Sequence, residues 1–142
     1  TDTLLYLAAR NEHVKTKIVP ALRNKKVVIC DRFTDSTIAY QVFGKKVNLK
    51  FINNIHKYIL NKLKPDLTFI LKVSSKVSQK RLSKRKTKNR YDNFSKSFYD
   101  KVQKSFLKLA RNKKSYIVLN SSSNDDNLEK KILEITKRYL KI

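Results

Sequence analysis

Two charged residues, Asp31 and Arg32, directly follow the short apolar run 27–30 (Val-Val-Ile-Cys). A short run rich in β-branched residues predicts a buried strand of a parallel sheet. Polar side chains at the carboxyl end of such a strand lie where open α/β sheets bind ligands. Arg32 can direct two parallel N–H donors at a phosphate group. The alternative is an ordinary ion pair between Asp31 and Arg32 on a surface loop.

The residues after this pair extend the candidate site. Residues 34–37 (Thr-Asp-Ser-Thr) form a hydroxyl-rich turn, and residues 38–41 predict the first turn of a helix. Tyr40 and Gln41 supply a flat aromatic face and an amide, which together suit a nucleobase. The stretch 27–41 therefore predicts a site for a phosphorylated, base-containing ligand.

A second pair of candidate residues, Tyr6 and Arg10, lies near the start of the chain. The two are four positions apart on a predicted helix and share one of its faces. Taken alone, this pair is more simply explained as a core aromatic residue beside a solvated arginine.

Several blocks resemble those of one known family. The order Asp-Arg-aromatic, two residues, Ser-Thr, two residues, Tyr-Gln in 31–41 resembles the signature of thymidylate kinases. The block 4–10 (Leu-Leu-Tyr-Leu-Ala-Ala-Arg), the Pro-Asp-Leu-Thr of 65–68 and the stretches 80–85 and 89–92 are similar to further blocks, in the family's order. The resemblance spans nearly the whole chain.

The resemblance implies a fold and a reaction. It implies a P-loop NTPase-like nucleoside monophosphate kinase fold, a three-layer α/β/α arrangement with a parallel sheet, in one domain spanning 1–142 with a lid at about 80–93. It implies transfer of the ATP γ-phosphate to dTMP, giving dTDP for dTTP synthesis. Mg²⁺ would accompany ATP, and the protein would be a cytoplasmic homodimer.

The resemblance also assigns roles by position. The residues expected to bind dTMP are Tyr6, Arg10, Arg32, Ser36, Thr37, Tyr40 and Gln41, with Tyr6 under the base and Arg10 at the monophosphate. The expected catalytic residues are Arg85 and Arg90, at the transferring phosphate, and Asp31, which would act near Mg²⁺ and water or orient Arg32. The loop of Asn120 and Ser121 would hold the adenine, and no residue is assigned to a metal.

One part of the kinase is missing from the sequence. Gly44 is the only glycine, so no glycine-rich phosphate loop is present. The chain has no Met and opens inside a helical pattern, so we expect residues upstream of Thr1 to be missing. In relatives, the strand leading to that loop lies between the strands matching 27–30 and 67–73. Without it, we expect the isolated chain to be unstable and inactive as a kinase.

The net charge of the chain is compatible with functions other than that of a thymidylate kinase. The 34 Lys and Arg against 11 Asp and Glu give a net charge of +23, which favours anionic partners. A kinase of another nucleotide or deoxynucleoside on the same fold is one alternative, and a basic nucleic-acid-binding protein is another. Nucleic acid is the less favoured partner, because the most basic window lacks the interleaved aromatics that single-strand binders use. No membrane span is expected, and the single Cys30 fits a reducing cytoplasm.

Apolar periodicity predicts the elements that position these residues. Helices are predicted over 3–24 with a kink or a break near Pro20, over 48–63 with Asn48 as cap, from Ser74 or Ser75 to 84, and from Ser95 to 112. Strands are predicted over 27–30, 67–73 and 116–119, and a last helix after them. Strands that alternate with helices imply a parallel sheet.

Overall fold

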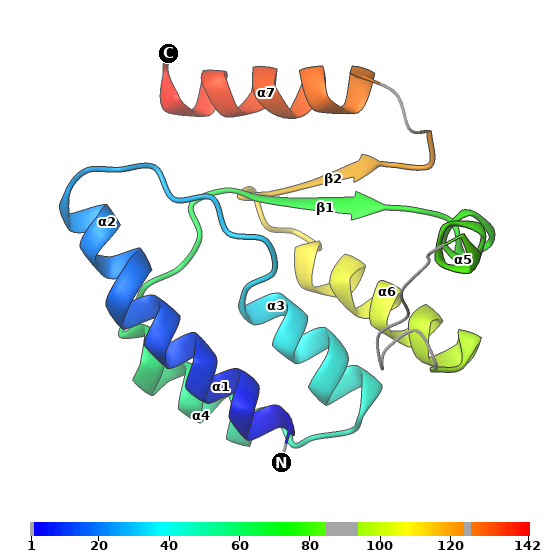
Figure 1. Cartoon of the computed structure of the whole chain (residues 1–142), viewed down its shortest axis with the longest axis horizontal. Helices are drawn as coiled ribbons and strands as arrows, with labels where there is room; N and C mark the ends of the chain where they lie inside the picture. The colour runs from blue at the N-terminus through cyan, green and yellow to red at the C-terminus, as the bar shows by residue number, and fades with distance from the viewer. Residues whose placement is uncertain (1, 85–93, 124–125) are drawn as a thin grey trace. The chain divides into compact units, whose positions relative to one another are not determined.

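The computed structural model of the chain describes residues 2–84, 94–123 and 126–142 (Figure 1). These residues group into two compact units. Unit 1 comprises Thr1–Asp66 and Lys101–Leu109, and unit 2 comprises Leu67–Asp100 and Ala110–Ile142. The expectation of one domain stays a prediction.

Unit 1 opens with a helix of three sections. These are α1 (Asp2–His13), the π-helical turn η1 (Val14–Ile18) and α2 (Val19–Arg23). The wide turn η1 immediately precedes Pro20, which has no N–H to donate and whose ring crowds the carbonyl four residues earlier. The helical segment continues through Pro20 without a break, with a π-helical turn just before it, and the kink predicted there stays a prediction.

A second helical segment follows the loop 24–33. It consists of α3 (Thr34–Thr37) and the π-helix η2 (Ile38–Gly44). The helix predicted to begin at 38 therefore begins at Thr34, and the prediction of a non-helical turn over 34–37 is wrong. Next comes α4 (Leu49–Leu60), in which Asn48 Oδ1 accepts a hydrogen bond from Phe51 N at 3.1 Å. Asn48 is thus the N-cap that the sequence predicts.

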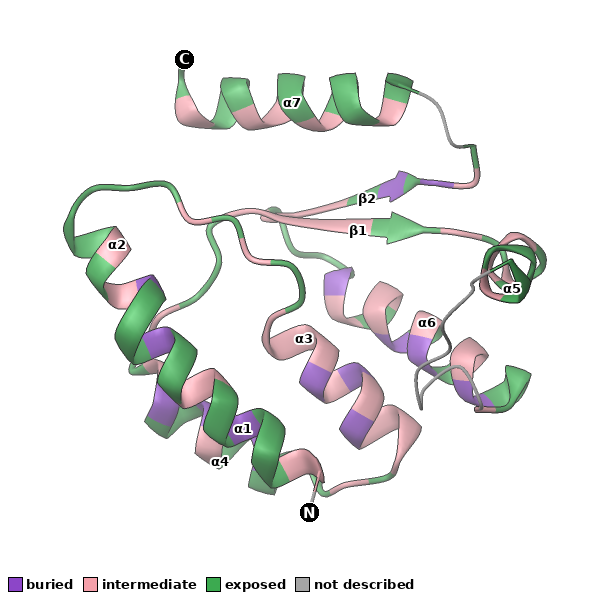
Figure 2. Ribbon diagram, in the orientation of Figure 1, coloured by how far each residue is buried: buried purple, intermediate pink, exposed green. Residues whose placement is uncertain are grey.

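The core of unit 1 lies between the first helical segment and α4. Its buried residues are Leu7, Val14 and Ile18 from α1 and η1, and Ile52 and Ile59 from α4. All five belong to the apolar stripes that the sequence predicts. Figure 2 shows buried positions on α1 and on α4. This packing fixes the face of α1 that carries Arg10.

The strand predicted over 27–30 is wrong. These residues form no strand, and Ile29 is 92% exposed. Val28 packs against the core of unit 1, so only one face of the segment is covered. A strand requires a hydrogen-bonded neighbour, and no strand in the described part of the chain pairs with this segment.

Unit 2 contains the parallel pair that the sequence predicts. β1 (Thr68–Lys72) and β2 (Tyr116–Asn120) run side by side, with Thr68 opposite Tyr116 and Lys72 opposite Asn120 (Figure 1). The crossover between them includes α5 (Ser75–Ser83) and α6 (Lys96–Ala110). Parallel strands need such a crossover, and here it is helical.

The caps and the last helix complete unit 2. Ser74 Oγ accepts from Val77 N at 3.3 Å, and Ser95 Oγ accepts from Phe98 N at 3.2 Å, so both residues cap helices as predicted. The last helix, α7 (Asp126–Leu140), has no buried residue (Figure 2). Within the described residues, no helix combines the length and the apolar character that crossing a membrane requires.

Candidate nucleotide site

Arg10 is the centre of a polar cluster in unit 1. Its Nη2 donates to the carbonyl of Phe33 at 3.0 Å and to Oγ1 of Thr37 at 3.2 Å. Its guanidinium also lies over the Phe33 ring, 4.8 Å from the centroid. Arg10 is therefore held by groups from another part of the chain, not free in solvent.

The electrostatics of Arg10 follow from this position. Burial lowers the pKa of Arg10, and the charge of Cys30 acts in the opposite direction. Nε of Arg10 is buried and has no hydrogen-bond partner. An anion beside the guanidinium would offset the cost of burying its charge.

Thr37 and Phe33 are positioned by the start of α3. The chain turns into this helix at Phe33, whose carbonyl also accepts from Ser36 N at 3.2 Å. Thr37 is buried one turn later. The helix α3, formed by the hydroxyl-rich residues 34–37, therefore places the buried hydroxyl of Thr37 against Arg10.

Arg32 and Tyr40 form a second contact. The Arg32 guanidinium lies over the Tyr40 ring, 5.4 Å from its centroid, within the range of a cation–π interaction. Tyr40 also meets Phe106 edge to face, at 6.4 Å between ring centroids. The Tyr40 ring, which is predicted to contact the base, thus touches both a second aromatic ring and a cation.

The backbone of Arg32 is in the left-handed region, with φ of 60°. Among the described non-glycine residues with positive φ, Arg32 alone precedes a helix. The others lie within two residues after a helix end: Lys25, Lys46, Asn61, Lys62, Asn112 and Lys141. A strained residue outside a helix cap is typical of ligand-binding sites.

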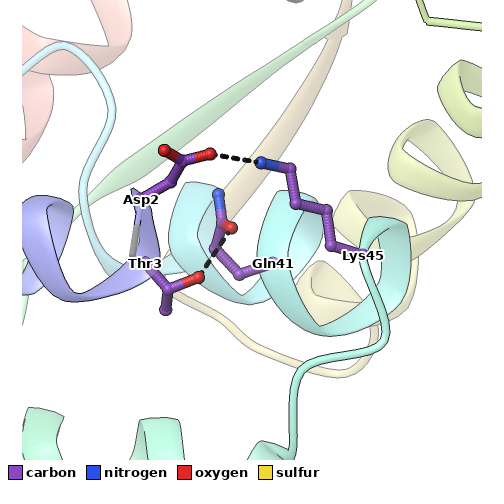
Figure 3. A network of polar contacts seen from close by, with 4 residues as sticks. All are labelled: Asp2, Thr3, Gln41 and Lys45. Carbon is purple, nitrogen blue, oxygen red and sulfur yellow. Dashed lines mark hydrogen bonds and ion pairs between the residues drawn. The ribbon is translucent and has the colours of Figure 1, made fainter.

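Gln41 makes a hydrogen bond within unit 1. Its Oε1 accepts from Oγ1 of Thr3 at 2.9 Å, and the residue is only 2% exposed (Figure 3). Beside it, Nζ of Lys45 pairs with Oδ2 of Asp2 at 3.2 Å. These two contacts attach η2 to the start of α1. The contact of Gln41 with a base stays a prediction.

The other candidate residues differ in exposure. Tyr6 is 41% exposed, Ser36 is half-buried and Asp31 is exposed. The structure thus brings together Arg10 with Thr37, and Arg32 with Tyr40. All the residues expected at dTMP, and Asp31, lie in unit 1.

Sequence reasoning assigned no functional role to two residues of unit 1 that the structure singles out. Phe33 appears there only as the aromatic of the motif, whereas its carbonyl and ring both contact Arg10. His56 is assigned no role, yet it is buried on α4 with Nε2 unpartnered. Its position four residues after Ile52 on the apolar stripe is a signal of burial that the sequence contains.

The residues expected at the adenine lie in unit 2. Ser121 is buried; its N–H donates to the Lys72 carbonyl at 2.7 Å, and its own carbonyl accepts from Arg81 Nη2 at 2.8 Å. Asn120 Oδ1 accepts from Ser122 N at 3.0 Å. The loop after β2 is therefore held by both β1 and α5. Arg85 and Arg90, and most of the expected lid, lie outside the described residues.

The described residues do not form a metal centre. They contain no group of three or more His, Cys, Asp or Glu side chains able to hold an ion. Asp31, expected near Mg²⁺, is exposed and belongs to no such group of side chains among the described residues.

The parallel strands joined by a helical crossover are consistent with an α/β nucleotide kinase fold. A family model described as thymidylate kinase matches residues 1–132. The chain belongs to the thymidylate kinase family.

Comparisons with individual relatives point to the same family. The chain is 34% identical over 141 residues to a thymidylate kinase of Mycoplasmoides gallisepticum, covering 99% of this chain and 67% of the relative. It is 41% identical over 137 residues to one of Wolbachia pipientis wMel, covering 94% and 68%. The crystal structure of thymidylate kinase from Ehrlichia chaffeensis superposes with a TM-score of 0.71 at 30% identity, covering 97% of this chain and 65% of that one. The chain thus spans about two thirds of the length of these relatives.

Proposed function

We propose that this protein transfers the γ-phosphoryl group of ATP to dTMP, and that unit 1 supplies the acceptor site. The observation that carries the proposal is the Arg10 cluster. A partly buried guanidinium is held by the Phe33 carbonyl and the Thr37 hydroxyl, and its Nε remains without a partner. Such a cation binds a phosphate monoester well, because a preorganised donor loses little entropy on binding.

The other residues of the acceptor site complete the recognition of dTMP. Arg32, whose backbone is strained and whose guanidinium lies over Tyr40, would add a second charge at the phosphate. Tyr6, exposed on α1, would stack on the thymine, and Tyr40 would lie beside the sugar. Ser36, Thr37 and Gln41 would provide hydrogen bonds. Together these residues neutralise and orient the acceptor, which is most of what phosphoryl transfer requires of a protein.

The roles proposed for the residues that would contact ATP are supported by the family resemblance alone. The loop of Asn120 and Ser121 would hold the adenine, Arg85 and Arg90 would neutralise charge on the transferring phosphoryl group, and Asp31 would orient Arg32 or water near Mg²⁺. Bound with ATP, Mg²⁺ would neutralise its phosphates. A cytoplasmic location and a homodimer belong to the same proposal.

Titration of this chain with dTMP tests the acceptor site. The measurement is chemical-shift perturbation or calorimetry with dTMP, and with thymidine, which lacks the phosphate. We expect Arg10→Lys to weaken dTMP binding at least about tenfold, because Lys cannot contact the phosphate bidentately. Thymidine binding should not change.

The matched control is Arg23→Lys, an exposed arginine at the end of α2. It should leave binding of both ligands unchanged. Equal binding of dTMP by the wild type and Arg10→Lys would contradict the proposed acceptor site. Tighter binding of dCMP or dAMP than of dTMP would favour a kinase of another nucleotide.

A further inference from the structure

Two side-chain contacts join the middle of α6 to η2 within unit 1. The rings of Phe106 and Tyr40 meet edge to face, with 6.4 Å between their centroids and 73° between their planes. Two residues further along α6, Nζ of Lys108 lies over the ring of Phe43, 5.5 Å from its centroid. Residues 101–109 and all of η2 belong to unit 1. This section of α6 therefore packs on the helix that carries Tyr40.

The backbone of Tyr40 is fixed by hydrogen bonds from the residues that follow η2. The carbonyl of Tyr40 accepts from Lys45 N at 3.0 Å, and the carbonyl of Gln41 accepts from Val47 N at 2.9 Å. The side chain of Gln41 is also held, by Oγ1 of Thr3. These bonds leave the rotation of the Tyr40 ring undetermined, because the torsion next to an aromatic ring has a broad energy minimum. The orientation of the ring must therefore be set by its side-chain contacts.

Phe106 supplies a contact that restricts this rotation. It lies four residues after the buried Val102, and so on the same face of α6. Edge-to-face rings favour particular relative orientations, because the positive edge of one ring is attracted to the negative face of the other. The Arg32 guanidinium over the same Tyr40 ring adds a further contact. The ring is thus oriented before a ligand arrives, and a preorganised group loses less entropy on binding.

We propose that Phe106 is a positioning residue for Tyr40 in the acceptor site. Phe106 acts without touching the acceptor, by holding the Tyr40 ring in the orientation that faces the nucleoside part of dTMP. The inference rests on the proposed function, since it requires that Tyr40 contact the bound nucleotide. It gives a role in binding to α6, which carries none of the residues expected at dTMP.

The competing explanation is that Phe106 only fills space beside η2. The two explanations differ in whether the effect of Phe106 requires the Tyr40 ring. A loss of packing would weaken ligand binding whatever side chain stands at position 40. A residue that acts through Tyr40 has no further effect once that ring is removed. A double-mutant cycle over the two positions therefore separates the explanations.

The experiment measures dissociation constants of dTMP and thymidine for the complete chain and its variants. Phe106→Leu and Tyr40→Leu are made singly and together, and Phe106→Tyr keeps an aromatic ring at the contact. We expect Phe106→Leu to weaken binding of both ligands, which share the nucleoside, roughly fivefold alone and less than about twofold when added to Tyr40→Leu. Phe106→Tyr should bind both ligands within about twofold of the wild type.

The matched control is Lys108→Gln. It removes the cation over Phe43 and leaves the aromatic pair in place, so it perturbs the same packing of α6 on η2 without touching Tyr40. Its binding of both ligands should stay within about twofold of the wild type. A Lys108→Gln protein as impaired as Phe106→Leu would show that the packing of α6, and not the orientation of Tyr40, controls binding.

Other results would also overturn the inference. An equal loss on Phe106→Leu with and without the Tyr40 ring would show a space-filling role. Unchanged binding by Phe106→Leu, or a Phe106→Tyr protein as weak as Phe106→Leu, would show that the aromatic contact is not needed. If Tyr40→Leu binds dTMP as the wild type does, the acceptor site stands without Tyr40 and only this inference fails. If the wild type does not bind dTMP, the proposed function itself fails.

A second measurement requires no variant. In the wild-type chain with isotope-labelled aromatic rings, nuclear Overhauser contacts between Tyr40 and Phe106 should persist at saturating dTMP. The ring resonances of Tyr40 should shift on binding of dTMP and of thymidine. Loss of the contacts between the rings at saturating dTMP, or Tyr40 resonances that do not shift, would overturn the inference even if Phe106→Leu fails to fold.

Discussion

Nη2 of Arg10 donates to Oγ1 of Thr37 at 3.2 Å, across 27 residues of sequence. The contact joins α1 to α3, and both residues belong to unit 1. A hydroxyl from α3 therefore orients a cation that the first helix carries. This relationship connects the two sequence blocks expected at dTMP.

The first prediction concerns that hydroxyl. Thr37→Val keeps the shape of the buried side chain but removes its oxygen, which leaves an Arg10 donor with one partner fewer. We expect the free energy of unfolding to fall by about 1 kcal/mol and dTMP binding to weaken several-fold. Chemical denaturation and a dTMP titration measure the two effects. Thr37→Ser is the matched control, and a Ser variant as impaired as the Val variant would show that the hydroxyl is not the cause.

The second prediction concerns pH. The pKa of His56 is lowered from 6.5 to about 4 in the folded protein, so the unfolded chain takes up this proton first as the pH falls. The free energy of unfolding should therefore decrease between pH 6.5 and about 4, by up to about 3 kcal/mol from this group, and this contribution should then level off. Urea denaturation at a series of pH values measures the slope.

Comparison with His56→Gln isolates this effect, because the carboxylates that also titrate in this range are common to both proteins. The variant should show a flatter dependence of stability on pH between 6.5 and 4 than the wild type. Two parallel curves would mean that His56 does not titrate differently in the folded and unfolded states.

The third prediction concerns the strained backbone of Arg32. Glycine adopts a φ of 60° without the cost that a Cβ imposes, so Arg32→Gly should keep or slightly raise stability while it weakens dTMP binding. Lys46→Gly is the control, because Lys46 has φ of 61° in unit 1 but is not among the residues expected at dTMP. The midpoint of thermal unfolding should change for Lys46→Gly as it does for Arg32→Gly. An Arg32→Gly protein that binds dTMP normally would remove Arg32 from the site.

The fourth prediction concerns the cap of α4. Asn48→Ala removes the acceptor for Phe51 N and should lower the free energy of unfolding by about 1 kcal/mol. Asn53→Ala, at an exposed position inside the same helix, should be neutral or slightly stabilising, because alanine has the higher helix propensity. Equilibrium denaturation of both variants measures the difference. Similar stabilities of the two would mean that the capping bond contributes little.

Local signals in the sequence predicted much of the fold. The apolar spacing of Leu7, Val14 and Ile18 predicted the first helix, and Asn48 predicted where α4 begins. The parallel strands β1 and β2 were also predicted, since both are short apolar runs between helical patterns. These features depend on residues close together in the chain, which is why a sequence pattern reveals them.

The segment 27–30 shows the limit of such patterns. Val27 and Ile29 have the β-branched character of a strand, yet both are exposed and the segment forms no ladder. Strand formation depends on a hydrogen-bonded neighbour, which local composition does not supply. The prediction failed because it inferred a non-local partnership from a local pattern.

By itself, the sequence determined the family, the two parallel strands, the helix caps and the residue types of the acceptor site. Only the tertiary structure decided that Arg10 meets Phe33 and Thr37, that Gln41 accepts from Thr3, and that His56 is buried. The physical reason is distance along the chain. Helix periodicity and capping act over a few residues, whereas these contacts join segments that only packing brings together.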